Sequence, residues 1–581
     1  MAHLHKKVKK DHTYYYIRES QRIKGRPTIV NQIYLGTADK VQSLLDFPEG
    51  SLPEGFSPKE YGSVFLINEL DQEIDLAAMI DELLPPGKKI RGPSLGEIIF
   101  YAAMNRAIAP TSKRKLAAWY EQTDIQRIRP VRLTSLSSQN FWNHWDRVRT
   151  SELEKIKGRF FKKILSLTDD PDNEHLLLEA SLLFPTMTNG NSQRAATGVS
   201  RLAKPPRRGV KVALVTNRLG IPIYYQAYED DEPVSRYFDQ VLTTLLNKVA
   251  ALGGTYRDLT VLLGIGTNSG PLRDKIAGHD QIHYLAAVSP ESSPDLLAAP
   301  RSRYAVLPCR HNQRLQAQGE GHYRIRCFGP RLTEAGQEVI LFDPAMFKKA
   351  RRELREKIQK LRQDLIVWQR ELRQQPVPAF AEEIESRFAH RCRELGLTAD
   401  VMHLTCARQN GKTFVQARLN RHYCSDLLKK MGKVVIQTDR LDWSMEEFCD
   451  LAVDRGLLGD SPNRPPTIFQ SALTPQYHWT DSKIPIHVFV CMAALTYLCF
   501  LNSRLAAAGL LLNAKEAMEE MRAMKTAIFL LAEDAKPLRL FEEPTDLQMQ
   551  IIAALGYELD EGRLVAQDAP PGAVNAEPME A

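Results

Sequence analysis

Cysteine is scarce in this chain and unevenly placed. Only eight of its 581 residues are cysteines, and the first of them is Cys309. No two cysteines form a C-x-x-C pair, so neither a disulfide framework nor a zinc site of ordinary spacing is expected. This cysteine usage fits a reducing compartment, and we expect a cytoplasmic protein.

Other common signals are missing as well. No uninterrupted apolar run of about 18 residues is evident, so we expect no membrane span. The basic start MAHLHKKVKK is not followed by an apolar segment, which argues against a signal peptide. The phosphate-loop pattern GxxxxGK[ST] is absent, and Gly264–Gly270 carries only a GxG that favours a plain turn. The formal charge of +7 is a weak indication of a nucleic-acid partner.

The first 60 residues predict a β-hairpin arm. Two β-rich runs, Thr13–Ile17 and Thr28–Leu35, flank a turn at Lys24-Gly25. Basic residues surround the hairpin: Lys6, Lys7, Lys9, Lys10, Arg18, Arg22, Lys24 and Arg26. These side chains either follow a phosphate backbone or form a solvated charged face.

Residues 61–170 predict a helical domain. Ser94 or Pro93 can begin one helix, and further helices fit 112–122 and 138–148. A basic amphipathic helix over 152–167 carries one apolar stripe, formed by Ile156, Phe160 and Ile164. The domain is either a DNA-binding domain or a helical bundle whose stripe packs in its own core.

A β-rich stretch follows over residues 171–289. Its predicted strands are 175–183, 210–216, 221–228 and 259–263, with a helix over 238–252. A strand, a hairpin, a helix and another strand is the order of an RNase H-like core, although other α/β folds share it. The fold class predicted for the chain is α/β.

Residues 290–433 predict an insertion within that core. Its helix over 345–374 carries apolar residues at alternating spacings of four and three: Leu354, Ile358, Leu361, Leu365, Trp368 and Leu372. This seam packs either within the chain or in a homodimer. Residues 434–560 would complete the core and add C-terminal helices, and 561–581 are expected to be a disordered tail.

Several ordered segments resemble one protein family. They are HKKVKKDHTYYYIRESQRIKGRPTIVNQIYLGTADKV near the start, VT…IPI at 215–223, GTNS at 266–269, TD…DWS…EE at 438–447, and P…YHWTD…KI…HVF at 475–489. In these segments the chain resembles IS4-type transposases of the IS1634 group. The resemblance implies an RNase H-like core with a large insertion before its last helix, and double-stranded DNA as partner. Such enzymes cut DNA with three carboxylates that hold two metal ions.

The positions that match the three acids read Glu179, Gly264 and Gly459. Glu179 could still serve as one metal ligand, but its extra methylene displaces the carboxylate relative to aspartate. Asp258, the nearest acid before Gly264, would lie about 20 Å away along an extended strand. Asp460 is a substitute candidate for the third acid, in a region where a capping box at Ser444 predicts a helix start.

The first hypothesis is therefore a transposase-family protein that binds element ends for transposition or its regulation and does not cut DNA. No cofactor is expected, or Mg²⁺ or Mn²⁺ if activity remains. Its DNA-contacting candidates are Lys204, Arg207, Arg208, Lys6, Lys7, Lys9 and Lys10. One alternative is an active metal-dependent nuclease that uses Glu179 and Asp460. The other is an assembly protein without DNA affinity that acts through the 345–374 helix. His478, Asp481 and His487 favour structural roles over a metal site.

Overall fold

The protein is described by a computed structural model in which the chain divides into two compact units. The first comprises Met1–Leu259 and Ile468–Ala581, and the second Thr260–Thr467. The described residues are 2–9, 12–23, 26–36, 58–85, 92–168, 175–185, 209–228, 234–254, 256–265, 268–374, 380–409, 412–459, 483–529, 538–560 and 563–566. The second unit is thus inserted, in chain order, into the first.

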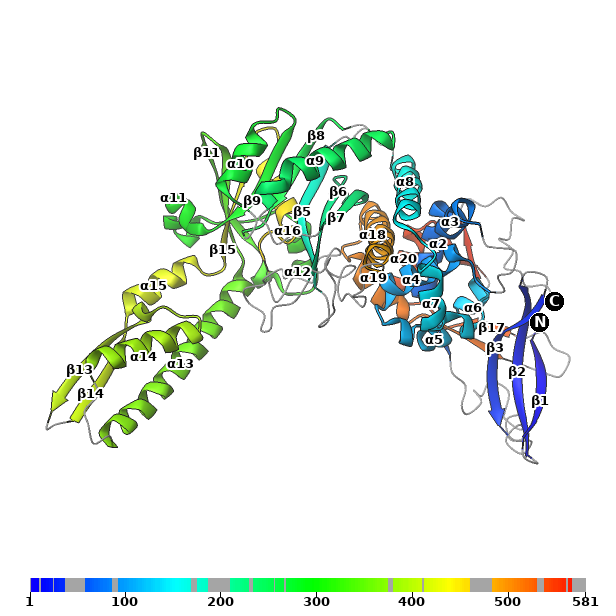
Figure 1. Ribbon diagram of the computed structural model, residues 1–581, viewed down its shortest axis with the longest axis horizontal. Helices are drawn as coiled ribbons and strands as arrows, with labels where there is room; N and C mark the ends of the chain where they lie inside the picture. Colours follow the sequence, from blue (N-terminus) through cyan, green and yellow to red (C-terminus); the bar gives the residue numbers. More distant parts are fainter. Residues whose placement is uncertain are drawn as a thin grey trace. The chain divides into compact units, whose positions relative to one another are not determined.

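The N-terminal part of the first unit is an antiparallel three-stranded sheet. Its strands are β1 (Ala2–Lys9), β2 (His12–Ile23) and β3 (Arg26–Gly36), in the order β1-β2-β3. The predicted hairpin is confirmed as β2 and β3, and β1 is an additional strand (Figure 1). Tyrosines favour strands, and a long partner strand lets the lysine-rich β1 pair with them.

The predicted helical stretch is confirmed. Its helices are α2 (Gly62–Ile74), α3 (Leu76–Leu83), α4 (Leu95–Ile108), α5 (Lys113–Glu121), α6 (Ile125–Ile128), α7 (Ser138–Trp145) and α8 (Thr150–Leu167). Ser94 forms a capping box with Glu97 at the start of α4. The stripe of Ile156, Phe160 and Ile164 on α8 is buried, so core packing accounts for it.

The strands and helix expected after residue 170 are also present. They are β5 (His175–Pro185), β6 (Gly209–Thr216), β7 (Pro222–Tyr228), α9 (Val234–Ala251) and β8 (Asp258–Leu263). β5, β6 and β7 pair antiparallel in that order. The turn before β7 closes through a hydrogen bond from Ile221 N to Asn217 Oδ1 at 2.9 Å, with Gly220 at φ +84°.

Helix α18 (Ile484–Ala507) is a core helix of the first unit. It corrects the expectation that the chain has no apolar segment of about 18 residues. Its mean hydropathy is 2.1 over an 18-residue window, so it could cross a membrane by length and composition alone. However, 94% of that window is buried, which is the behaviour of a core helix. Figure 1 shows α18 beside α4 and α19 (Ala514–Arg522), which both contact it.

The C-terminal elements of the first unit are short. β16 (Lys525–Phe529) pairs with β17 (Leu538–Phe541) and β4 (Lys59–Glu60), and α20 (Asp546–Ala554) follows. β18 (Tyr557–Asp560) pairs with β19 (Arg563–Ala566). The predicted disordered tail is therefore wrong for residues 563–566, and residues 567–581 lie outside the described part.

The second unit contains most of a large mixed sheet. Its strands lie in the order β10-β11-β12-β15-β9-β8. The bounds of these strands are β9 (Ile282–Val288), β10 (Ala305–Val306), β11 (Arg326–Thr333), β12 (Gly336–Phe342) and β15 (Lys433–Thr438). Around them come α10 (Gly270–Ala277), α11 (Pro294–Ala298), α12 (Arg310–Ala317) and α16 (Met445–Asp454). The chain is thus a mixed α/β protein.

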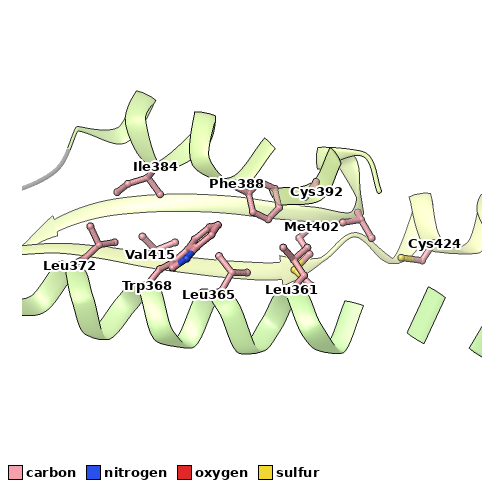
Figure 2. Close-up of a cluster of buried hydrophobic side chains, with 11 residues drawn as sticks. Leu361, Leu365, Trp368, Leu372, Ile384, Phe388, Cys392, Met402, Val415 and Cys424 are labelled. Carbon is pink, nitrogen blue, oxygen red and sulfur yellow. The ribbon is translucent and has the colours of Figure 1, made fainter. Parts of the chain in front are cut away.

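A lobe with its own core extends from this sheet. It consists of α13 (Pro344–Gln374), α14 (Ala381–Glu394), β13 (Met402–Gln409), β14 (Lys412–Leu419) and α15 (Arg421–Lys430). Figure 2 shows Leu361, Leu365, Trp368 and Leu372 of α13 pointing toward Ile384 and Phe388 of α14 and Val415 of β14. The predicted seam is therefore covered by the chain itself. It is not a free surface for a second copy, which removes the surface that the assembly hypothesis needs.

Candidate functional site

Glu179 lies on strand β5, at the position where its pairing with β6 becomes irregular. It pairs with Leu214, and the register shifts between Glu179 and Leu182. Leu176, Leu177 and Leu178 before it are buried, whereas Glu179 is half-buried. A bulge re-aims the side chain beside it, so the carboxylate lies where the strand departs from regular pairing.

Gly264 immediately follows the fully buried strand β8. Its carbonyl oxygen accepts a hydrogen bond from Asn268 N at 3.0 Å. The nearest upstream acid, Asp258, begins β8, and its Oδ2 lies 2.8 Å from His175 Nδ1 at the start of β5. Asp258 is thus engaged at the opposite end of the strand from Gly264, as its sequence separation predicts.

Gly459 does not lie in a helix, contrary to the expectation for the family's third acid. The predicted helix start at Ser444 is confirmed by its capping box with Glu447, but α16 ends at Asp454. Gly456 and Gly459 both have positive φ, +71° and +82°, and Gly459 N donates to Gly456 O at 3.0 Å. The glycines end the helix because they adopt left-handed conformations at little steric cost. Asp460 lies outside the described residues.

The acids that lead into this segment are engaged with neighbouring groups. Asp439 accepts a hydrogen bond from Tyr284 N at 2.8 Å, and its Oδ2 lies 3.1 Å from His283 Nδ1. Asp442 accepts hydrogen bonds from Nε and Nη2 of the buried Arg440, at 3.1 and 2.7 Å. Arg440 also donates to Thr260 Oγ1 at 3.1 Å, so this pair anchors the chain after β15 to β8.

Within the described ranges, no group of three or more His, Cys, Asp or Glu side chains is placed to hold a metal ion. His487, which we expected to be structural, is buried in α18, where its Nε2 lies 3.7 Å from Cys491 Sγ and its ring 6.4 Å from that of Trp145. His478 and Asp481 lie outside the described residues. None of the eight cysteines forms a disulfide bond.

Of the basic candidates, Lys6 and Lys7 are exposed on β1. Lys9 is the last residue of β1, where it pairs with His12. The remaining candidates lie outside the described residues: Lys10, Lys204, Arg207 and Arg208.

The register of the N-terminal sheet separates its side chains into two different faces. Directly paired residues share a face, and successive residues of a strand alternate between faces. Lys7 pairs with Tyr14, and therefore shares a face with Tyr16, Arg18 and Arg22 of β2. On this face the Arg18 guanidinium lies 6.0 Å from the centre of the Tyr16 ring, and its Nε donates to Gln32 Oε1 at 2.8 Å. We call it the Lys7 face.

The opposite face carries Lys6, paired with Tyr15, together with Glu19. Glu19 Oε2 accepts from Arg127 Nη2 of helix α6 at 3.1 Å, which ties this face to the helical part of the first unit. The Lys7 face therefore combines Lys7, Arg18 and Arg22 with Tyr14 and Tyr16, whereas Lys6 and Tyr15 lie on the opposite face. The sequence listed these residues but did not show that β1 is a strand, so it could not sort them by face.

No family model matches the chain, and no curated protein matches it. One solved structure with some similarity is a piggyBac transposase synaptic complex with hairpin DNA. The similarity covers 80% of this chain and 81% of that chain at 10% sequence identity, with a TM-score of 0.30. At that TM-score the similarity is too weak to assign a fold family or a function.

Proposed function

We propose that this chain is a DNA-binding relative of IS4-type transposases that no longer cuts DNA. The element order from β5 to β8 and the inserted second unit are compatible with an RNase H-like core. Of the three positions that resemble the family's acids, Gly264 and Gly459 have no side chain to bind a metal ion. A protein of this kind would occupy element ends and compete with, or regulate, an active relative.

The observation that carries the DNA-binding proposal is the Lys7 face. Lys7 and Arg22 are exposed, and Arg18 is half-buried beside the Tyr16 ring. Lysine and arginine contacts to phosphates dominate nonspecific affinity for DNA and make it depend on salt. Aromatic neighbours hold such side chains in place and add cation–π attraction. The positive charge of this face therefore complements the negative charge of a duplex backbone.

Replacing Lys7 with glutamine is expected to weaken duplex binding. Each lost phosphate contact lowers the magnitude of the negative slope of log K against log salt by about 0.9, and adding Arg22→Gln should roughly double that change. Fluorescence anisotropy of a labelled duplex over a series of salt concentrations measures both quantities.

Lys6→Gln is the matched control, because it removes the same charge from the adjacent, equally exposed position on the opposite face. It should change the slope by much less than Lys7→Gln. Equal effects of the two substitutions would show that only net charge matters and would contradict a specific role for the Lys7 face.

The wild-type protein is expected not to nick duplex DNA in Mg²⁺ or Mn²⁺. The variant Glu179→Asp, Gly264→Asp, Gly459→Glu restores the family's acids but should remain inactive. Its third substitution places a side chain at φ +82°, a conformation that costs about 1–2 kcal/mol for an L-residue and aims the glutamate from a turn instead of a helix. Gel analysis of a supercoiled plasmid detects a single nick. Metal-dependent nicking by the wild type would instead favour an active nuclease with replacement acids.

A further inference from the structure

One side of helix α13 carries cations and no acids, whereas its remaining lysines share the other side with the acids. At about 100° per residue, Lys348, Arg351, Arg352, Arg355 and Arg362 all fall roughly 60–160° from Leu354 on the helix circumference. The four acids of α13 lie on the other side of the buried seam, at about 200–280°: Glu353, Glu356, Asp364 and Glu371. The five cations are exposed. We call their side of the helix the Arg355 face.

Two of the four acids of α13, Asp364 and Glu371, form ion pairs within the lobe. Arg391 of α14 donates to Asp364 at 2.7 Å, and Arg387 of α14 donates to Glu371 at 3.0 Å. Helix α14 therefore lies on the side of these two carboxylates. The Arg355 face has no comparable partner helix among the described residues, and its one ion pair there is the exposed contact of Arg352 with Glu356 at 3.8 Å. An exposed pair of this length contributes little.

A further cation lies close to the start of α13. The Arg301 guanidinium lies 4.4 Å from the centre of the Phe347 ring and 4.5 Å from that of Phe342. Next to Phe347, Lys348 Nζ donates to the Tyr323 hydroxyl at 2.7 Å. Arg301 is exposed, so it adds a sixth cation whose position is held by aromatic contacts.

We propose that the Arg355 face, together with Arg301, binds the phosphate backbone of double-stranded DNA. Lys348 and Arg362 are about 21 Å apart along the helix at 1.5 Å per residue. A duplex presents one phosphate charge per about 1.7 Å of its axis, so a row of this length faces many phosphates. A face that only contacts solvent tolerates carboxylates among its cations, whereas none of the four acids of α13 lies on the Arg355 face. This inference rests on the proposed DNA-binding function and adds a contact surface in the second unit.

The test compares two triple variants of the full-length chain. Arg351→Gln, Arg355→Gln and Arg362→Gln remove three charges from the Arg355 face. The magnitude of the negative slope of log K against log salt should fall by about 2.7 in anisotropy titrations of a labelled duplex of arbitrary sequence. The matched control, made of Lys349→Gln, Lys357→Gln and Lys360→Gln, removes three charges from the opposite side of α13. It should lower the slope by less than about 1.

The outcomes separate this inference from the proposed function. Equal losses in the two triple variants, or no loss in the arginine variant, would overturn the inference, and sensitivity to Lys7→Gln would then leave DNA binding by the N-terminal sheet intact. Loss in the arginine variant alone supports the inference, whatever Lys7→Gln does. A wild type that binds no duplex would overturn both proposals. Hydrogen exchange of α13 amides checks that both triple variants retain the lobe.

Discussion

Replacing Asp71 with alanine is expected to destabilise the first unit by about 3–5 kcal/mol, as when one partner of a buried ion pair is removed. Asp71 is fully buried near the end of α2. Its Oδ2 accepts from Arg129 Nη2 at 2.6 Å, and its Oδ1 accepts from the Tyr497 hydroxyl at 2.6 Å and from Leu76 N at 3.0 Å. One carboxylate thus satisfies three donors.

These three donors come from segments that are distant in the chain. Leu76 begins α3 just after Asp75, whose φ of +52° separates α2 from α3. Arg129 follows α6 and also donates to Asn68 at 2.7 Å, and Tyr497 is a fully buried residue of α18. Alanine would leave a buried hydroxyl and a largely buried guanidinium without this acceptor, and each unsatisfied group has a desolvation cost of its own.

The opening free energy of α18 amides, measured by hydrogen exchange, checks this prediction. Asp71→Asn should have a smaller effect than Asp71→Ala, because the neutral isostere keeps an acceptor oxygen. Burial also raises the pKa of Asp71, although Arg129 opposes that shift, so the charged form is less favoured at this position than in water. Glu73→Gln is the control on the same helix, since the Glu73–Arg504 pair is partly exposed and such pairs contribute about 1 kcal/mol or less. A loss below about 1 kcal/mol for Asp71→Ala would contradict the prediction.

Local sequence signals located most elements of this fold. Ser94 and Ser444 each have a glutamate three residues later, and both form the capping box that this spacing predicts. The apolar spacing of α8 and α13 identified buried residues on each helix, although Ile358 is only half-buried and α8 also buries Leu153 and Phe161. These signals work because they depend on neighbours within one or two turns of the same helix.

The misses depend on contacts between distant segments or on helix ends. Strand β1 is rich in lysine and histidine, which have little preference for strands. Its pairing with the tyrosines of β2 stabilises the strand instead. Helix α18 is buried on all sides, so it has no apolar period to detect, and His487 interrupts its apolar run. For the candidate site, residue identity showed that Gly264 and Gly459 lack side chains. Only the backbone showed that Gly459 lies in a turn beyond α16.

Replacing Trp368 with alanine is expected to destabilise the lobe formed by α13, α14, β13, β14 and α15 by about 3–5 kcal/mol. Trp368 is only 8% exposed and belongs to a cluster with the fully buried Leu361 and with Phe388 of α14 (Figure 2). The Arg387 guanidinium also covers its ring at 4.3 Å. Alanine would leave a cavity between α13, α14 and β14 that these rigid elements cannot close.

Hydrogen exchange should show that this loss stays within the lobe. Amides of α13 and β14 should lose protection in Trp368→Ala, while those of α18 in the first unit keep theirs, because the lobe has a separate buried cluster. Ile366→Ala is the control, since Ile366 is 53% exposed on the same helix and such substitutions change stability by about 0.5 kcal/mol or less. Equal loss of protection in α18 would mean that the two units unfold together. In that case a substitution that disturbs this cluster would lower DNA binding by destabilising the whole chain. The role of the Arg355 face in DNA binding would then follow only from variants, such as Arg355→Gln, that leave this cluster untouched.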